Sequence, residues 1–312
     1  MSSDETMPSH HGDDAKRSEF GGDCPNETIR LLHERSSCRS FHDRSIPPDV
    51  MQLVFEAGTH APTGGNLQPF SIIRIEKSEI TRKLAKLCGD QMFIAEAPTN
   101  LLFCIDWYRL RRWAEIELAP FAATSSFHHF WISFQDTIIA AQNICTAADA
   151  MGLGSVYVGT VTKCFRELRD MFELPRGVLP IVLLSLGYPK QRPAPKKKLD
   201  VSVIVHDEKY RQLDDDEITE AFNKKYPYPG VECTEERLTE LERVCRSVHG
   251  EEFAERCLDK TRERGRISVA QRYFGLHYTA DLMVKDSDKY LQLMEEFGFD
   301  WFKPYEPAGG QP

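Results

Sequence analysis

The loop at 61–70, Ala-Pro-Thr-Gly-Gly-Asn-Leu-Gln-Pro-Phe, gathers polar side chains on a backbone that fits no regular element. Two adjacent glycines can adopt positive φ and let a ligand approach the bare main chain. Carboxamides donate and accept hydrogen bonds, which suits the polar edge of a heterocycle. A plain helix-to-strand turn is the alternative interpretation, since Gly-Gly pairs are common in turns. The loop predicts a site for a flat, polar-edged ligand, bordered by Pro62, Thr63, Gly64, Asn66 and Gln68.

A second candidate cluster lies at 35–41, Arg-Ser-Ser-Cys-Arg-Ser-Phe. Guanidinium groups bind phosphate oxygens through paired hydrogen bonds, and serine hydroxyls add further donors. The two arginines, Arg35 and Arg39, and the serine hydroxyls beside them could therefore bind a phosphate. The alternative is a solvated basic helix end.

The elements that must position these clusters alternate between helices and strands. A helix over 26–35 precedes the phosphate-type cluster, and another leads into the loop, which a strand over 70–75 follows. From Asp136 to Met151 the pattern predicts one buried helix with almost no polar face. Further predicted elements are a helix at 78–88, a helix at 163–172, and strands at 101–105, 155–159 and 180–189. No Gly-x-Gly-x-x-Gly motif follows a strand, so the pattern favours an α+β fold over a Rossmann fold.

Composition narrows the class of protein. A net charge of −9 with a pI near 5.6 disfavours nucleic-acid binding. Nine cysteines, an odd number with no Cys-x-x-Cys pair, indicate reduced thiols and neither a disulfide framework nor a zinc site. Charged residues interrupt the longest apolar run, and residues 1–24 are polar, lack a signal-peptide core and carry only an isolated His10–His11 pair. We therefore expect a disordered tail at 1–24 on a soluble cytoplasmic protein with no metal, membrane or nucleic-acid partner.

Together these segments resemble the FMN-dependent nitroreductase family over residues 26–210. Besides the two clusters, the resemblance rests on Ala140-Ala141-Gln142-Asn143, Gly152-Leu153-Gly154 and the strand end at 183–189. It implies an α+β fold with a central mixed or antiparallel sheet, surrounding helices, and an intertwined homodimer with FMN at the interface.

The resemblance also assigns roles to residues. Arg35, Ser36, Ser37 and Arg39 would hold the FMN phosphate, with Lys196 or Lys197 completing that site. Pro62, Thr63, Gly64 and Asn66 would approach the isoalloxazine from the partner subunit, with Gln68 near by. Val158 and Gly159 would pass the reactive N5 edge.

The function implied is hydride transfer from NAD(P)H, through flavin N5, to an electron-poor nitroaromatic or quinone-like acceptor in a ping-pong scheme that needs no catalytic side chain. Two alternatives stay open. One is a specialised flavin enzyme of the same fold, such as a reductive dehalogenase, a flavin-fragmenting enzyme or a biosynthetic dehydrogenase. The other is a non-catalytic flavin- or protein-binding module.

Beyond a flavin-binding domain at 25–210, the composition becomes charged and helical, which predicts a C-terminal helical extension at 211–312. Leu238, Leu241, Cys245 and Val248 form one apolar stripe at helical spacing. Aromatic residues are dense at 273–278 and 297–302. We expect the helices to wrap the partner subunit and some of these aromatics to restrict access to the flavin, although packing alone also explains aromatic clustering.

Overall fold

The computed structural model describes residues 26–285 and 287–306, and its chain divides into two compact units. The first comprises residues 26–104, Gln135–Lys163 and Ile181–Pro195, and the second comprises Ile105–Phe134, Cys164–Pro180 and residues 196–306. Each unit contains several separate segments of the chain, whereas the sequence predicted one boundary at residue 210. The predicted tail at 1–24 and its histidine pair lie outside the described residues.

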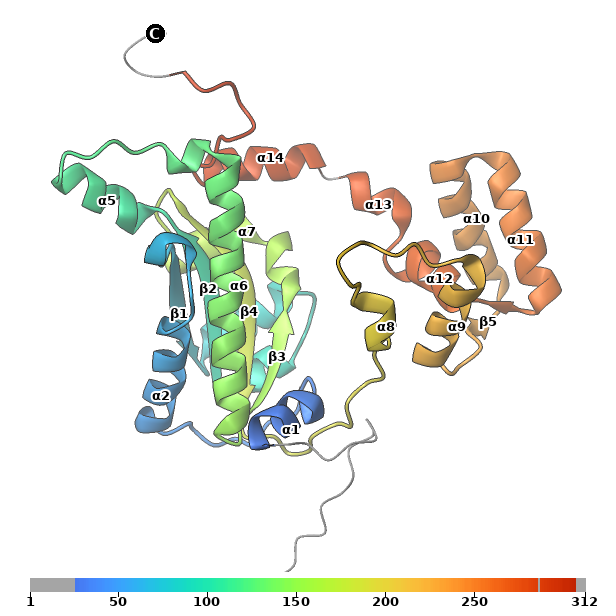
Figure 1. Ribbon diagram of the computed structural model, residues 1–312, viewed down its shortest axis with the longest axis horizontal. Helices are drawn as coiled ribbons and strands as arrows, with labels where there is room; N and C mark the ends of the chain where they lie inside the picture. Colours follow the sequence, from blue (N-terminus) through green and yellow to red (C-terminus); the bar gives the residue numbers. More distant parts are fainter. Residues whose placement is uncertain (1–25, 286, 307–312) are drawn as a thin grey trace, which may run out of the picture. The chain divides into compact units, whose positions relative to one another are not determined.

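A four-stranded sheet of order β1-β2-β4-β3 organises the first unit (Figure 1). Its strands are β1 (Phe70–Glu76), β2 (Thr99–Asp106), β3 (Gly154–Val158) and β4 (Val178–Gly187). β3 and β4 pair antiparallel, with Val156 opposite Ser185. Every residue of β2 is buried, as expected for a strand covered on both faces. The prediction of an α+β fold around a central sheet is confirmed.

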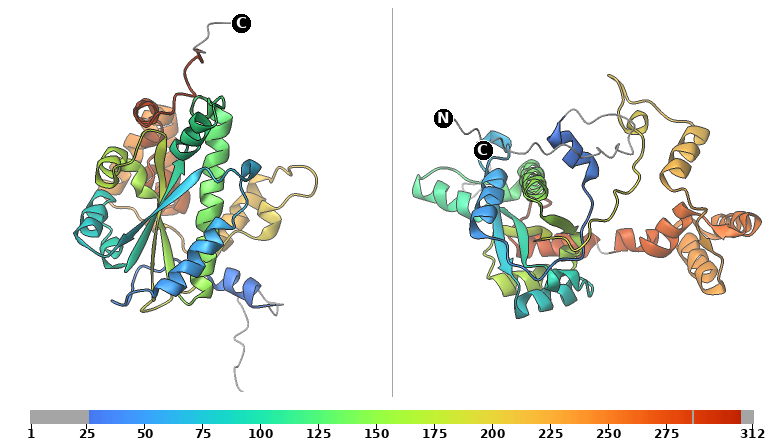
Figure 2. Two further views of the ribbon diagram at one scale, coloured as in Figure 1. Left: turned by 90° about the vertical axis from the view of Figure 1, so that its left-hand side faces the viewer. Right: turned by 90° about the horizontal axis from the view of Figure 1, so that it is seen from below.

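Helices cover both faces of this sheet. They are α2 (Pro48–Thr59), α3 (Glu79–Leu87), α4 (Phe93–Glu96) and α6 (Phe127–Ala150). The preceding helix α1 (Glu27–Glu34) has no buried residue. α2 and α6 pack on one face through Val54 and Ile144, which share a buried cluster with Leu101, Phe103 and Leu184 (Figure 2). Alternate residues of a strand point to opposite faces. Accordingly Asn100 lies on the other face, where its Nδ2 donates to the Ile94 carbonyl of α4 at 3.0 Å.

Local signals located the helix starts that precede and follow the loop. The Asn26 side chain accepts from Ile29 N at 3.0 Å, and Ser78 caps α3 in a capping box. The predicted start of the long helix at Asp136 is wrong, because α6 begins at Phe127. Its first turns carry aromatic rings that pack against the chain's C-terminal end: Phe130 contacts both Phe299 and Trp301. Tertiary packing therefore extends a helix whose local sequence lacks a helical pattern.

The second unit is mainly helical, which confirms the helical nature of the C-terminal extension. Its helices are α5 (Tyr108–Ile116), α7 (Phe165–Phe172), α8 (Val201–Ile204), α9 (Asp215–Lys225), α10 (Glu235–His249), α11 (Glu251–Arg264), α12 (Val269–Arg272), the π-helix η4 (Tyr273–His277), α13 (Ala280–Lys285) and α14 (Ser287–Glu296). The short strands β5 (Val231–Glu232) and β6 (Arg266–Ile267) pair antiparallel. Leu241 and Cys245 of the predicted stripe are buried with Ala254 and Ile267, whereas Val248 is exposed.

The two aromatic segments of the extension have different surroundings. Trp301 packs on Phe127 and Phe130, and Phe297 packs on Phe165 of α7. Tyr273 and Phe274 instead border a cavity among the C-terminal helices. Packing is thus the observed role of the 297–302 segment. Among the described helices, none combines the length and apolar character needed to cross a membrane.

Candidate functional site

The loop after α2 is fixed largely by its own hydrogen bonds. Gly65, Asn66 and Gln68 all have positive φ, at 60°, 54° and 50°, a region that side chains other than glycine rarely occupy. Gln68 N donates to Thr63 Oγ1 at 3.2 Å, and Gln68 Nε2 donates to Thr59 O at 2.8 Å. Pro62, Gly64 and Asn66 are exposed. The loop therefore presents a fixed backbone surface with the Asn66 carboxamide at its edge.

A buried carboxylate on α6 holds this loop in place. Asp136 is 4% exposed, and its two oxygens lie 3.1 and 3.2 Å from Gly64 N, which donates to them. Burial raises the pKa of Asp136, although the hydrogen bond from Gly64 opposes the shift. Sequence reasoning treated Asp136 only as a charge that interrupts an apolar run. An acidic residue inside a helix without a polar face was the signal that could have identified it.

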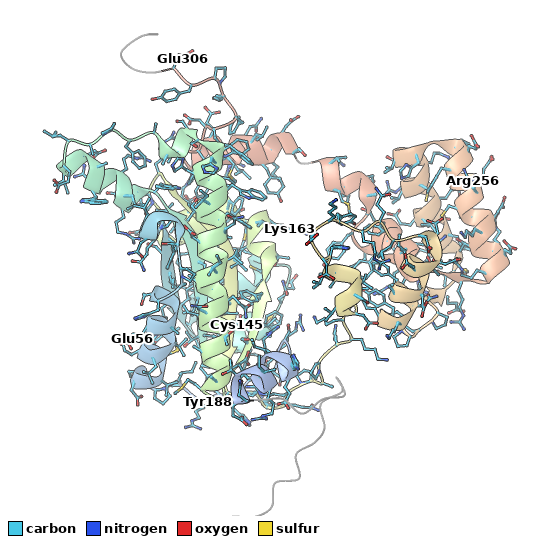
Figure 3. All side chains as sticks on the ribbon, in the orientation of Figure 1. Glu56, Cys145, Lys163, Tyr188, Arg256 and Glu306 are labelled. Atoms are coloured by element: carbon cyan, nitrogen blue, oxygen red, sulfur yellow. The ribbon has the colours of Figure 1, made fainter. Side chains whose placement is uncertain are left out.

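The phosphate-type cluster runs from the end of α1 along β3. Arg35 follows α1, and its Nη1 lies 3.9 Å from the Sγ of Cys145. Figure 3 labels Cys145 on α6. Ser36 Oγ donates to Pro193 O at 2.6 Å. Ser37 forms a parallel β-bridge with Ser155. The cluster is thereby held between α6, the edge strand and the connector that follows β4.

Part of this cluster borders a cationic hollow of about 540 Å³. Its lining residues are Ser37, Arg39, Ser40, Lys190, Gln191 and Pro193. Two cations and two hydroxyls face it and no carboxylate lines it, a donor set that fits a phosphate dianion. Lys190 was not predicted. Its main-chain N donates to Ser40 O at 3.0 Å, which places the connector beside the cluster.

A larger hollow of about 720 Å³ lies next to α1 and α6 and is bordered by Arg35, Asp149 and Arg192 among others. Arg192 Nη1 lies 2.9 Å from Asp149 Oδ1, and its Nη2 donates to Leu153 O. The Asp149 side chain is 2% exposed, and its Oδ2 has no hydrogen-bond partner in the described part of the chain. Burial raises the pKa of Asp149, although Arg192 opposes the shift. This ion pair holds the connector against the end of α6.

The remaining predicted residues fall in two places. Val158 is buried at the end of β3, and Gly159 is exposed just after it. A Cβ added to Gly159 would meet no atom within 4 Å, so a ligand could approach the main chain there. Lys196 and Lys197 are exposed and belong to the second unit, and their role at the phosphate stays a prediction.

The loop and the phosphate-type cluster lie at different heights along α6. The loop contacts α6 at Asp136, and the cluster contacts it at Cys145, nine residues further along the helix. A helix rises about 1.5 Å per residue, so the backbone positions of these two residues differ by about 14 Å along its axis. Within the ranges 26–285 and 287–306, no three His, Cys, Asp or Glu side chains gather as a metal site.

Comparison with known proteins identifies the class. Residues 32–188, half of the chain, match the model of the nitroreductase family. The chain is 33% identical over 196 residues to an FMN reductase [NAD(P)H] of Bacillus subtilis, covering 62% of this chain and 78% of that protein. It is 32% identical over 193 residues to an NADPH-flavin oxidoreductase of Vibrio harveyi, with the same coverage. The chain belongs to the nitroreductase family and is an oxidoreductase of that family.

The fold likeness continues past the family match. The structure of Bacillus megaterium NfrA2 aligns with a TM-score of 0.69 at 23% identity, covering 89% of this chain and all of that chain. Residues 26–210 are only 185 of the 312 residues, so that coverage extends into the C-terminal helices. The extension lies outside the family model but has counterparts of similar fold.

Proposed function

We propose that this protein is an FMN-dependent oxidoreductase that takes hydride from NAD(P)H and passes it to an electron-poor nitroaromatic or quinone-like acceptor in a ping-pong scheme. The observation that carries the proposal is the hollow bordered by Ser37, Arg39 and Lys190, which offers cations and hydroxyls without a carboxylate. Membership of the nitroreductase family and the names of the two relatives support the same cofactor and donor.

Each part of the chain has a separate task in this proposal. Arg39, Ser37 and Lys190 would bind the FMN phosphate by charge-assisted hydrogen bonds, with Arg35 and Ser36 supporting them and Lys196 or Lys197 completing the site. The backbone at 62–66, with Gln68 near by, would pack against the isoalloxazine, and Val158 and Gly159 would line its N5 edge. When bound, FMN supplies the hydride chemistry, while the protein supplies binding, orientation and electrostatics.

We further propose that two copies of the chain share each FMN in a homodimer. One support is that the loop and the phosphate-type cluster contact α6 at points about 14 Å apart along its axis, so the two ends of the proposed site are separate within one chain. Another is a row of exposed aromatic side chains along α6, in which Phe127 contacts Trp131 and Trp131 stacks on Phe134. Contiguous exposed apolar surface of this kind marks interaction sites.

Purification gives the first test. We expect a yellow protein that sediments as a dimer, releases FMN and not FAD on denaturation, and oxidises NAD(P)H rapidly with a quinone. Ping-pong transfer predicts parallel double-reciprocal plots when both substrates are varied. A colourless monomer that takes up no added FMN would contradict the proposal. A flavin-loaded dimer that turns over one restricted substrate alone would favour the specialised-enzyme alternative.

A further inference from the structure

The C-terminal helices surround a cavity of about 990 Å³ that none of the proposed flavin-binding residues borders. Its walls come from α9, the segment before β5, the end of α11, the start of β6, α12 and the π-helix η4. A volume of this order is within the range of small-molecule sites, about 300–1,000 Å³. The cavity is therefore large enough for a ligand the size of a nucleotide.

Five aromatic rings line this cavity: Phe222, Tyr226, Tyr228, Tyr273 and Phe274. Tyr226 is central, with ring centroids 6.4 Å from Phe222, 5.8 Å from Tyr228 and 6.3 Å from Tyr273. Phe274 is 57% exposed, so its face is open to a ligand. Rigid aromatic faces that remain open can bind a flat ring by stacking or edge contacts.

Two arginines border the same cavity, Arg264 at the end of α11 and Arg266 on β6, where Glu232 is its neighbour across the strand pair. Neither the Arg264 nor the Arg266 guanidinium has a hydrogen-bond or ion-pair partner within residues 26–285 and 287–306. The contrast with neighbouring arginines is clear: Arg243 pairs with Glu240 and Asp281, Arg246 with Glu242 and Glu251, and Arg262 with Asp259. Unpaired guanidinium groups beside aromatic rings form a receptor for an anion attached to a ring.

The backbone around the cavity has two unusual features. Tyr273 begins a π-helix, a rare conformation that occurs frequently at functional sites. Gly230 has φ of 104°, and a Cβ there would lie 2.0 Å from Ile267 O, so only glycine permits this approach to β6 beside Arg266. One wall of the cavity therefore depends on a glycine, and another is shaped by a π-helix.

We propose that this cavity binds a small planar aromatic ligand that carries an anionic group, with the ring against Tyr226, Tyr273 and Phe274 and the anion on Arg264 and Arg266. A mononucleotide and an aromatic carboxylate share this chemistry. The site is independent of the proposed flavin chemistry, because none of its residues takes part in that proposal.

Calorimetric titration of the full-length, FMN-loaded protein with adenosine monophosphate and with 2-naphthoate tests the proposal. We expect saturable binding with one site per chain for at least one probe. Binding of adenosine monophosphate alone would identify a nucleotide site. Binding of both probes would show that an aromatic ring with an anionic group is sufficient for binding. The double variant Arg264→Gln/Arg266→Gln should bind at least tenfold more weakly, while Arg262→Gln on the same helix should bind as the wild type does.

Further readouts keep the result unambiguous. Phe274→Ala should also weaken probe binding. Because Phe274 is largely exposed, this change should leave the C-terminal helices folded. Absence of saturable binding by both probes would overturn the proposal. Equal affinity in the double variant would also overturn it, because the probe would then bind without the two arginines. A change in flavin absorbance during the titration would overturn it too, because the probe would then bind beside the flavin. If the wild type binds neither probe and the double variant no longer forms the oligomer, the surface is a protein interface, and the ligand proposal is overturned.

Discussion

The loop at 61–70 and the connector beside the phosphate-type cluster are each held by one buried carboxylate of α6, but the two parts of the proposed site are built differently. Asp136 accepts from the main-chain N of Gly64, and Asp149 pairs with the side chain of Arg192 on the connector. The loop uses Thr63 and Gln68 to hold itself together, whereas Arg39 and Lys190 remain directed to a hollow. The comparison teaches that backbone shape specifies one end of the proposed site and side-chain charge the other.

The largest expected effect is at the Asp149–Arg192 pair. Arg192 is partly exposed, but its removal would leave the buried Asp149 carboxylate without its ion-pair partner, so we expect Arg192→Ala to lower the free energy of unfolding by about 3 kcal/mol. Urea unfolding measures this. The double variant Arg192→Ala/Asp149→Asn should recover much of the loss, because it also removes the buried charge. Equal destabilisation in the single and double variants would contradict the role of that charge.

The pH dependence of the same variant has a definite sign. Burial raises the folded-state pKa of Asp149 above the unfolded value, so protonation favours the folded state. The stability contributed by the protonated form is present below the unfolded pKa and lost as the pH rises through the folded pKa. We therefore expect the deficit of Arg192→Ala to shrink in acid, and unfolding curves across that pH range will measure it. A deficit independent of pH would assign it to lost packing.

The next effect concerns charge at the hollow. Arg39→Ala should weaken FMN binding by about 2 kcal/mol, because a charge-assisted contact to a dianion is lost, and the loss should diminish at high salt. Fluorescence titration of the apoprotein with FMN measures it. Arg82→Ala is a matched control, since Arg82 pairs with Glu79 on the surface of α3. Equal flavin affinity in both variants would mean that Arg39 is merely solvated.

Asp136 tests the other end of the comparison. Asp136→Ala leaves the Gly64 N–H without its acceptor, so we expect a loss of about 1.5 kcal/mol in unfolding free energy. Hydrogen exchange should also increase at residues 64–68. Asp136→Asn keeps an oxygen acceptor and should lose less. Unchanged exchange in the alanine variant would show that the loop holds its shape without the carboxylate.

The smallest effect separates loop strain from ligand contact. Asn66 has φ of 54°, which glycine adopts without strain. Asn66→Gly should therefore raise the free energy of unfolding by at most about 1 kcal/mol, because the greater freedom of glycine in the unfolded chain opposes the gain. Asp90→Gly, at φ of 55° in an exposed turn, is the control for backbone strain alone. We expect FMN affinity to fall only in Asn66→Gly. The same affinity in both variants would remove the Asn66 carboxamide from the site.

The sequence predicted the features that depend on neighbouring residues, such as helix starts and turns. Asn26 and Ser78 marked helix starts, and the Gly-Gly pair marked the loop, because caps and turns depend on residues a few positions apart. Asp136 was missed as a partner of Gly64 because 72 residues separate them. Lys190 and Arg192 were missed for the same reason, since the fold alone brings the connector to Ser40 and Asp149. Contacts between distant segments leave no periodicity to read.

The separation of the loop and the cluster along α6 has a consequence for genetics. If each flavin takes its phosphate contacts from one subunit and its ring contacts from the other, defects in the two regions belong to different complementation groups. A subunit with Arg39→Ala and a subunit with a disrupted 62–68 loop would each be defective alone. Random mixing would place both in half of the dimers, each with one intact site, so about a quarter of all sites would be restored. Two alleles of one gene would then rescue each other in a single cell.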